Sequence, residues 1–200
     1  MVWVSHERSS GVALSEDDVY GIHLSLRGLI LAADRFIAAT HNEEEAWAAG
    51  AEAGFWICVC DEGFEAVLDS LDGTSYASRR DGDSDGRYIP AIRWARNRMT
   101  HQRWISLEKH YGTELGHWVL DKGVLGTVDH MKWATTENIP REAKREWGRA
   151  TYEASMAGRP IKYAVECARD WLVGPALNEL SLQSGTGIAV GPLPRVWPAE

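Results

Sequence analysis

The chain has 200 residues with 29 acidic and 21 basic side chains, and its formal net charge of −8 argues against a surface that binds nucleic acid or anionic membrane throughout. Apolar residues make up 44% of the chain and charged residues 25%, which excludes wholesale disorder and is typical of one globular domain. Ten tryptophans, each a large ring system that is normally buried, are the unusual feature of the composition.

No apolar run approaches the ~18 residues that a membrane-spanning helix needs, and the first ten residues lack the apolar stretch of a secretory signal. Three cysteines are too few for a disulfide framework, and two of them are spaced as Cys58-Val-Cys60. We therefore expect a cytoplasmic protein without a membrane partner, in which the cysteines are reduced core residues.

Two long helices are predicted in the first third of the chain. Ser15 and the three acidic residues after it form a capping box, and apolar residues then recur at three- and four-residue spacing to about Thr40. Asn42 begins a second helix, acid-rich in its first turn, that continues to about Leu71. Because only a few residues join them, the two helices are expected to lie side by side and antiparallel.

The middle of the chain alternates between irregular and helical segments. Residues 72–87 are rich in turn formers and charges and predict a loop, and a third helix is expected from about Tyr88 to Ser106. Residues 110–139 contain four glycines between short apolar pairs, which predicts a β-hairpin or irregular insertion held by Trp118 and Trp133.

Two further helices are predicted near the C-terminus. Pro140 opens a fourth helix to about Ala157, and a fifth runs from Pro160 to about Leu180. The expected fold is therefore all-α, an antiparallel four- to five-helix bundle over residues 15–181, with the insertion between the third and fourth helices. Residues 182–200 are expected to form an extended tail.

The third predicted helix carries the residues most suited to chemistry. Its apolar face contains Ala91, Ile92, Ala95 and Met99, whereas the opposite face contains Arg93, Arg96, Asn97, Thr100, His101 and Trp104. No acidic residue lies between Tyr88 and Leu107, and residues 79–103 contain seven arginines against three aspartates. Such a donor-rich face indicates an anionic neighbour, which could be a phosphate, a nucleic-acid backbone or the carboxylates of a partner.

The string Arg96-Asn97-Arg98-Met99-Thr100-His101 resembles the R-N-x-x-x-H form of the motif found in HEPN-domain proteins, a family of helical bundles that includes prokaryotic ribonuclease toxins and defence proteins. The segment from Trp147 to Trp171 is similar to the C-terminal part of actinobacterial HEPN-like proteins, so the resemblance covers roughly residues 15–181. The insertion departs from the minimal bundle of that family.

This resemblance implies a metal-independent endoribonuclease that acts as a homodimer without a cofactor, in the role of a toxin or phage-defence effector, with an antitoxin as a further partner. His101 would be the general base or acid, and Arg96 would stabilise charge on the phosphoryl oxygens. Asn97 would assist by orienting the imidazole or holding a phosphate oxygen. Arg93, Thr100 and Trp104 on the same face are the expected contacts to RNA.

Two other interpretations of the same helix stay open. It could belong to a non-catalytic module that binds a nucleotide, nucleic acid or protein partner through the Arg/Asn/His face. Alternatively, this face could be an internal packing surface or a dimer contact, in which case the motif would be buried and paired. Trp94, which also flanks the motif, is expected to pack rather than to stack on bases.

One acidic motif suggests a metal but is incomplete. Asp81-Gly-Asp83-Ser-Asp85-Gly86 matches the first half of a calcium-binding EF-hand loop, but Ile92 occupies the twelfth position, where a bidentate glutamate is required. The histidines near the insertion match no usual zinc spacing. We therefore expect an acidic turn at residues 81–86 and no metal site.

Overall fold

The computed structural model describes residues 15–39, 42–72, 75–101, 107–110, 120–121, 124–125, 130–138 and 148–184. The long helices are α1 (Glu16–Ala38), α2 (Glu43–Asp72), α4 (Ile89–His101), α6 (Ile161–Trp171) and α7 (Leu177–Ser184). Shorter elements are α3 (Tyr76–Gly82), the 3₁₀ turns η1 (Gly86–Tyr88) and η2 (Thr136–Asn138), α5 (Arg149–Ser155) and the π-helical turn η3 (Leu172–Ala176). Four short strands are β1 (Leu107–His110), β2 (Leu120–Asp121), β3 (Val124–Leu125) and β4 (His130–Trp133).

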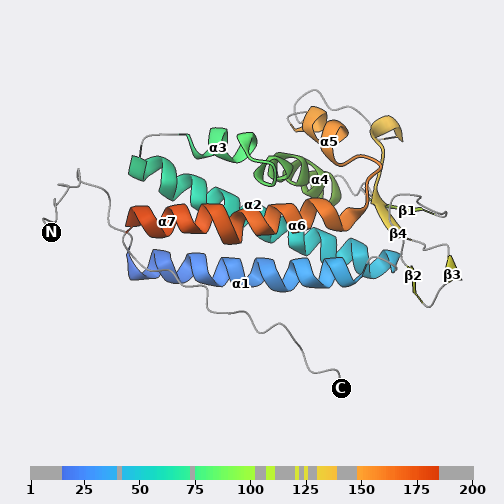
Figure 1. Ribbon diagram of the computed structural model, residues 1–200, viewed down its shortest axis with the longest axis horizontal. Helices are drawn as coiled ribbons and strands as arrows, with labels where there is room; N and C mark the ends of the chain where they lie inside the picture. Colours follow the sequence, from blue (N-terminus) through green and yellow to red (C-terminus); the bar gives the residue numbers. More distant parts are fainter. Residues whose placement is uncertain are drawn as a thin grey trace, which may run out of the picture.

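The helices form the predicted all-α bundle. In Figure 1, α1, α2 and the run from α6 to α7 lie lengthwise beside one another, and α3 and α4 follow α2 along its other side. One continuous core joins these helices, with contributions from Leu29, Phe36, Ile57, Phe64, Ile92 and Ala168. Among the described residues, no helix is both long and apolar enough to cross a membrane.

The α1–α2 pair begins as the sequence predicts and packs closely. The Ser15 hydroxyl accepts a hydrogen bond from the Asp18 N–H while the Asp18 carboxylate accepts one from the Ser15 N–H, which completes the capping box. A β-carbon built on Gly28 would lie only 2.6 Å from the Trp56 ring. The indole of α2 therefore occupies the space that a side chain on α1 would need.

Strand β1 lies almost entirely before the predicted insertion of residues 110–139 and pairs antiparallel with β4 inside it, with Leu107 opposite Trp133. Strands β2 and β3, also inside it, pair with each other. Trp133 is buried, packs its ring on Phe36 at a centroid distance of 5.9 Å, and donates from Nε1 to the Ile161 carbonyl at 3.3 Å. Trp133 therefore fastens the end of this insertion to the bundle, as predicted. Trp118 lies outside the described residues.

The prediction of a loop over residues 72–87 is wrong for residues 76–82, which form α3. Ser75 caps the N-terminus of α3 by accepting from the Ser78 N–H, and both Tyr76 and Arg80 are buried one helical turn apart. The turn-forming residues do appear, but later: the Asp83 carboxylate accepts from the backbone N–H groups of Asp85 and Gly86 at 2.7 and 3.1 Å.

The prediction of one unbroken helix from Pro140 to Ala157 is also wrong. Gly148 has a φ of +88° and precedes the short helix α5, so no regular helix passes through this position. A β-carbon on Gly148 would lie 2.9 Å from the Pro90 carbonyl and 3.0 Å from the Trp94 Cβ, so close packing on α4 sets this break. Residues 139–147 lie outside the described part of the chain.

The fifth predicted helix is present and longer than expected. Pro175, which has no N–H to donate, lies inside the π-helical turn η3 between α6 and α7. The helical run continues to Ser184, so the predicted extended tail is wrong for residues 182–184. The rest of that tail lies outside the described residues.

We predict that Gly28→Ala lowers the free energy of unfolding by about 1–3 kcal/mol, because the new methyl group would displace Trp56. Gly21→Ala in the same helix is the matched control. It has open space around it and should raise stability by about 0.5–1 kcal/mol. Urea unfolding followed by circular dichroism measures both, and equal stability of the two variants would contradict the close α1–α2 contact.

Candidate functional site

Helix α4 turns its apolar face into the bundle, as predicted. Ala91, Ile92, Ala95 and Met99 are all buried. Trp94 is buried too, with its ring 4.7 Å from that of Tyr152 and the guanidinium of Arg98 lying over it at 5.0 Å. The interpretation of Trp94 as a packing residue is therefore confirmed.

Arg93 on the polar face of α4 has its anionic neighbour within the same chain. Its terminal nitrogen lies 2.6 Å from the carboxylate of Asp61 on α2 and 3.7 Å from that of Glu62. Asp61 is completely buried, whereas Glu62 is exposed. The ion pair with Asp61 therefore draws α4 onto α2.

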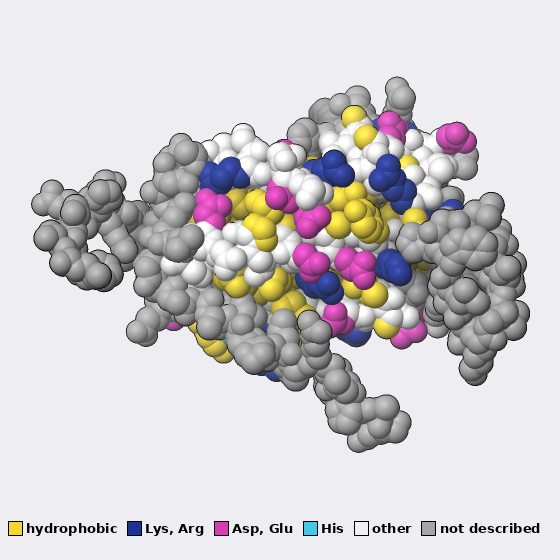
Figure 2. Space-filling model, viewed as in Figure 1, with side chains coloured by type: hydrophobic (Ala, Val, Ile, Leu, Met, Phe, Trp, Pro, Cys, Tyr) yellow, Lys and Arg dark blue, Asp and Glu magenta, His cyan; other side chains and the backbone are white. Residues whose placement is uncertain are grey.

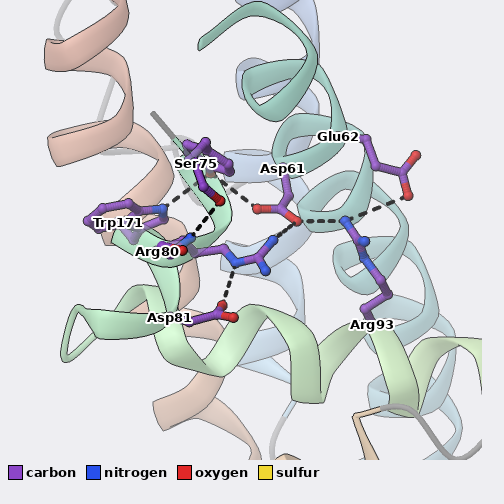
Figure 3. A network of polar contacts seen from close by, with 9 residues as sticks. Asp61, Glu62, Ser75, Arg80, Asp81, Arg93 and Trp171 are labelled. Atoms are coloured by element: carbon purple, nitrogen blue, oxygen red, sulfur yellow. Dashed lines mark hydrogen bonds and ion pairs between the residues drawn. The ribbon is translucent and has the colours of Figure 1, made fainter. Parts of the chain in front are cut away.

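Asp61 is the centre of a buried polar cluster, shown in Figure 3. The carboxylate accepts from the Arg80 guanidinium at 2.7 Å and from the Tyr76 hydroxyl at 3.1 Å, in addition to Arg93. The Trp171 indole in turn donates to the Tyr76 hydroxyl at 3.3 Å. The cluster thus connects four helices, α2, α3, α4 and α6.

Asp61 is not among the site residues predicted from the sequence, although a signal for its cluster is present there. Ile57, Asp61, Phe64 and Leu68 recur at the spacing of a buried helical stripe, so an aspartate occupies a core position. A buried carboxylate needs cationic or hydrogen-bonding partners, and the arginines of residues 79–103 are available to supply them. Burial, with the neighbouring Asp61 charge adding to it, raises the pKa of Tyr76.

Arg96 lies against α2 one turn further along α4. Its Cβ is 3.1 Å from the position that a β-carbon on Gly54 would occupy, so the missing side chain of Gly54 makes room for it. Its guanidinium hydrogen-bonds the thiol of Cys58. Burial raises the pKa of that thiol, and the charge of Arg96 only partly opposes this. Arg96 itself remains half-buried, at the boundary between α2, α4 and solvent.

The other predicted site residues are only partly described. Asn97 is half-buried next to Arg96, and the backbone of Thr100 and His101 forms the last turn of α4. The side chains of Thr100 and His101, and all of Trp104, lie outside the described part of the chain. The structure therefore brings Arg96, Asn97 and the backbone of His101 together on one unbroken helix.

Several arginines in residues 79–103 make contacts inside the fold. Arg80 and Arg98 are buried, and Arg79 forms an ion pair with Glu179 of α7 at 2.7 Å. Figure 2 shows basic and acidic side chains interspersed over the face it presents. The local positive charge thus serves largely to join helices.

The aspartates of the calcium-like motif also have structural partners. Asp81 pairs with Arg80 at 2.8 Å, and Asp83 makes the backbone contacts described above. Within the described part of the chain, no group of three His, Cys, Asp or Glu residues is arranged to hold a metal ion.

Comparison with protein-family models, with curated proteins and with solved structures finds no match for this chain.

We predict that Asp61→Asn costs about 3–5 kcal/mol of stability, because it leaves the buried Arg80 and the half-buried Arg93 without their counter-charge. Glu62→Gln, one residue away, is the matched control and should cost less than about 1 kcal/mol, because that carboxylate is exposed. Denaturant unfolding of both variants distinguishes them, and similar losses would show that Asp61 is not the centre of the cluster.

Stability should also decline at alkaline pH because of Cys60. Burial, with the charges of Asp61 and Cys58 adding to it, raises the pKa of this thiol from 9.0 to about 12. The folded protein therefore holds the proton more tightly than the unfolded chain. This contribution is complete below pH 9 and is lost as the pH rises toward about 12.

The variant Cys60→Ala should show a shallower loss of unfolding free energy between about pH 8 and about pH 10.5. Part of the decline should persist, since burial raises the pKa of Tyr76 as well. Urea unfolding at the two pH values measures the slope. A slope equal to that of the wild-type protein would contradict the assignment to Cys60.

Proposed function

We propose that this protein is a metal-independent endoribonuclease of the HEPN type that acts as a homodimer. The observation that supports this most is that Arg96, Asn97 and His101 lie on one unbroken helix, α4, whose opposite face is anchored in the core. Arg96 and Asn97 are half-buried at the boundary with solvent, where a phosphate can reach them.

In the proposed reaction, the 2′-hydroxyl of RNA attacks the adjacent phosphorus. The 2′-oxygen–phosphorus bond forms while the bond to the 5′-oxygen breaks, giving a 2′,3′-cyclic phosphate and a 5′-hydroxyl. His101 removes the proton from the 2′-hydroxyl or delivers one to the leaving oxygen, and two motifs in a dimer supply one group for each task. Arg96 stabilises the additional negative charge on the phosphoryl oxygens, and Asn97 orients the imidazole or holds a phosphate oxygen.

The remaining predicted residues divide between two roles. Thr100, inside the motif, and Trp104, three residues after it in the sequence, would contact RNA. Arg93 is already held by Asp61, so its role in this proposal is to fix the position of α4. A cytoplasmic toxin or phage-defence effector, restrained by an antitoxin, is the biological setting that fits such an activity.

A non-catalytic binding module is the second candidate, and a specific observation favours it. The guanidinium of Arg96 hydrogen-bonds the Cys58 thiol, so one arginine of the polar face of α4 already has a partner inside the fold. This candidate expects binding of RNA or a nucleotide that weakens steeply with salt, without turnover.

We expect purified protein to cleave single-stranded RNA in the presence of EDTA, and both Arg96→Ala and His101→Ala to reduce the rate by about 10²–10⁴-fold. Arg87→Ala is the matched control, because Arg87 is exposed on η1 and lies outside the motif. Circular dichroism should show that all three variants keep their helices. Undiminished cleavage by both motif variants would end the assignment, whereas salt-sensitive binding without cleavage would favour the second candidate.

A further inference from the structure

Phe55 is an aromatic side chain that the core does not use. It lies in the middle of α2 and is 48% exposed. Its neighbour Gly54 faces α4, where it contacts Arg96, and its other neighbour Trp56 faces Gly28 of α1. Because successive helical residues point about 100° apart, Phe55 projects outward between these two contacts.

The ring of Phe55 is held in position. It meets the Trp56 ring edge to face at a centroid distance of 5.2 Å, and Trp56 is itself wedged against Gly28. Phe55 also follows directly after the residue that touches Arg96. A rigid, half-exposed aromatic ring therefore lies level with the arginine of the proposed motif.

A second exposed aromatic residue, Trp47, lies nearer the N-terminus of α2. Helices α2 and α4 run antiparallel, because Arg93 meets Asp61 whereas Arg96, later in α4, meets the earlier Gly54. Moving from Arg96 toward His101 therefore leads back along α2 toward Trp47, which is 40% exposed. Phe55 is eight positions after Trp47, which corresponds to about 12 Å along the helix axis.

We propose that Phe55 and Trp47 form a stacking platform for two bases of a single-stranded RNA whose backbone crosses the motif of α4. Aromatic rings beside a cation are the combination that binds single strands, since the ring takes a base and the guanidinium takes the adjoining phosphate. This inference rests on the proposed function and assigns two side chains that would bind the bases of its single-stranded substrate, because a base in a duplex cannot reach a protein ring.

The surroundings of the platform favour RNA over a second copy of the chain. A stable protein interface buries about 800 Å² on each partner, whereas the two rings are eight positions apart on α2, with Glu52 of the exposed Arg35–Glu52 ion pair between them in the sequence. Glu43, Glu44 and Glu45 in the first turn of α2 repel phosphates beyond Trp47. The platform therefore accommodates a short stretch of nucleotides rather than a long track.

The test measures binding of a fluorescein-labelled, mixed-sequence ten-nucleotide RNA by anisotropy, in a His101→Ala background that prevents cleavage. Phe55→Leu and Trp47→Leu keep apolar bulk but remove the ring, and each should weaken binding roughly ten-fold. Tyr163→Leu is the control, because Tyr163 is similarly exposed but lies on α6. The affinity of this variant for the RNA should be unchanged. Binding of a duplex of the same sequence should be the same in all variants.

Unchanged affinity for RNA in both Phe55→Leu and Trp47→Leu would overturn the platform. The platform would also be overturned if the His101→Ala protein with both rings intact did not bind RNA. A change of oligomeric state in Phe55→Leu, measured by light scattering, would also overturn it by identifying Phe55 as a subunit contact. Ring-dependent binding by a wild-type protein that cleaves nothing would support the platform while refuting the ribonuclease. If Phe55→Leu and Trp47→Leu, each with His101 intact, cleaved RNA at the wild-type rate, the ribonuclease would be supported and the platform refuted.

Discussion

The buried carboxylate of Asp61 is the interaction on which the arrangement of this bundle depends. One oxygen receives two guanidinium groups and the other a tyrosine hydroxyl, so a single side chain of α2 fixes α3 and α4 and, through Trp171, contacts α6. Apolar packing alone allows helices to slide by small amounts, whereas bonds of 2.6–2.7 Å between charged groups tolerate little displacement. The ion pair between Arg93 and Asp61 therefore fixes α4 on α2, and this also sets the position of Arg96 beside Gly54 one helical turn away.

Helix α2 acts as the central element because its surface is uneven. Neighbouring helices can approach α2 closely at its small residues, which are Ala46, Ala49, Gly50, Ala53 and Gly54. Phe36 of α1 lies against Gly50, and Arg96 of α4 lies against Gly54. Trp56 does the opposite and fills a space on α1. Each neighbour thus meets a differently shaped side of α2, which defines one register for each contact.

The sequence predicted well what periodicity and capping control. The capping box at Ser15 and the apolar face of α4 are as expected, because each depends on residues a few positions apart. Long-range contacts account for the errors. Helix α3 forms in a polar, turn-rich segment because Tyr76 and Arg80 reach a carboxylate on α2. Contrary to the prediction, no helix runs through Gly148, because the backbone there packs against α4. For the candidate site, the motif identified the helix, but the partner of Arg93 could not be read from local spacing.

The burial of arginine leaves the rest of the chain more acidic than the formal net charge suggests. Asp61, Arg80, Arg98 and Arg149 are the buried charged side chains of the described residues, and together they carry a net +2. Subtracting that from the formal −8 leaves −10 for the remainder of the chain. A polyanion approaching from a distance therefore meets a repulsive field and feels the half-buried Arg96 only at close range. Added salt would then accelerate the encounter with RNA even as it weakens the contact that follows.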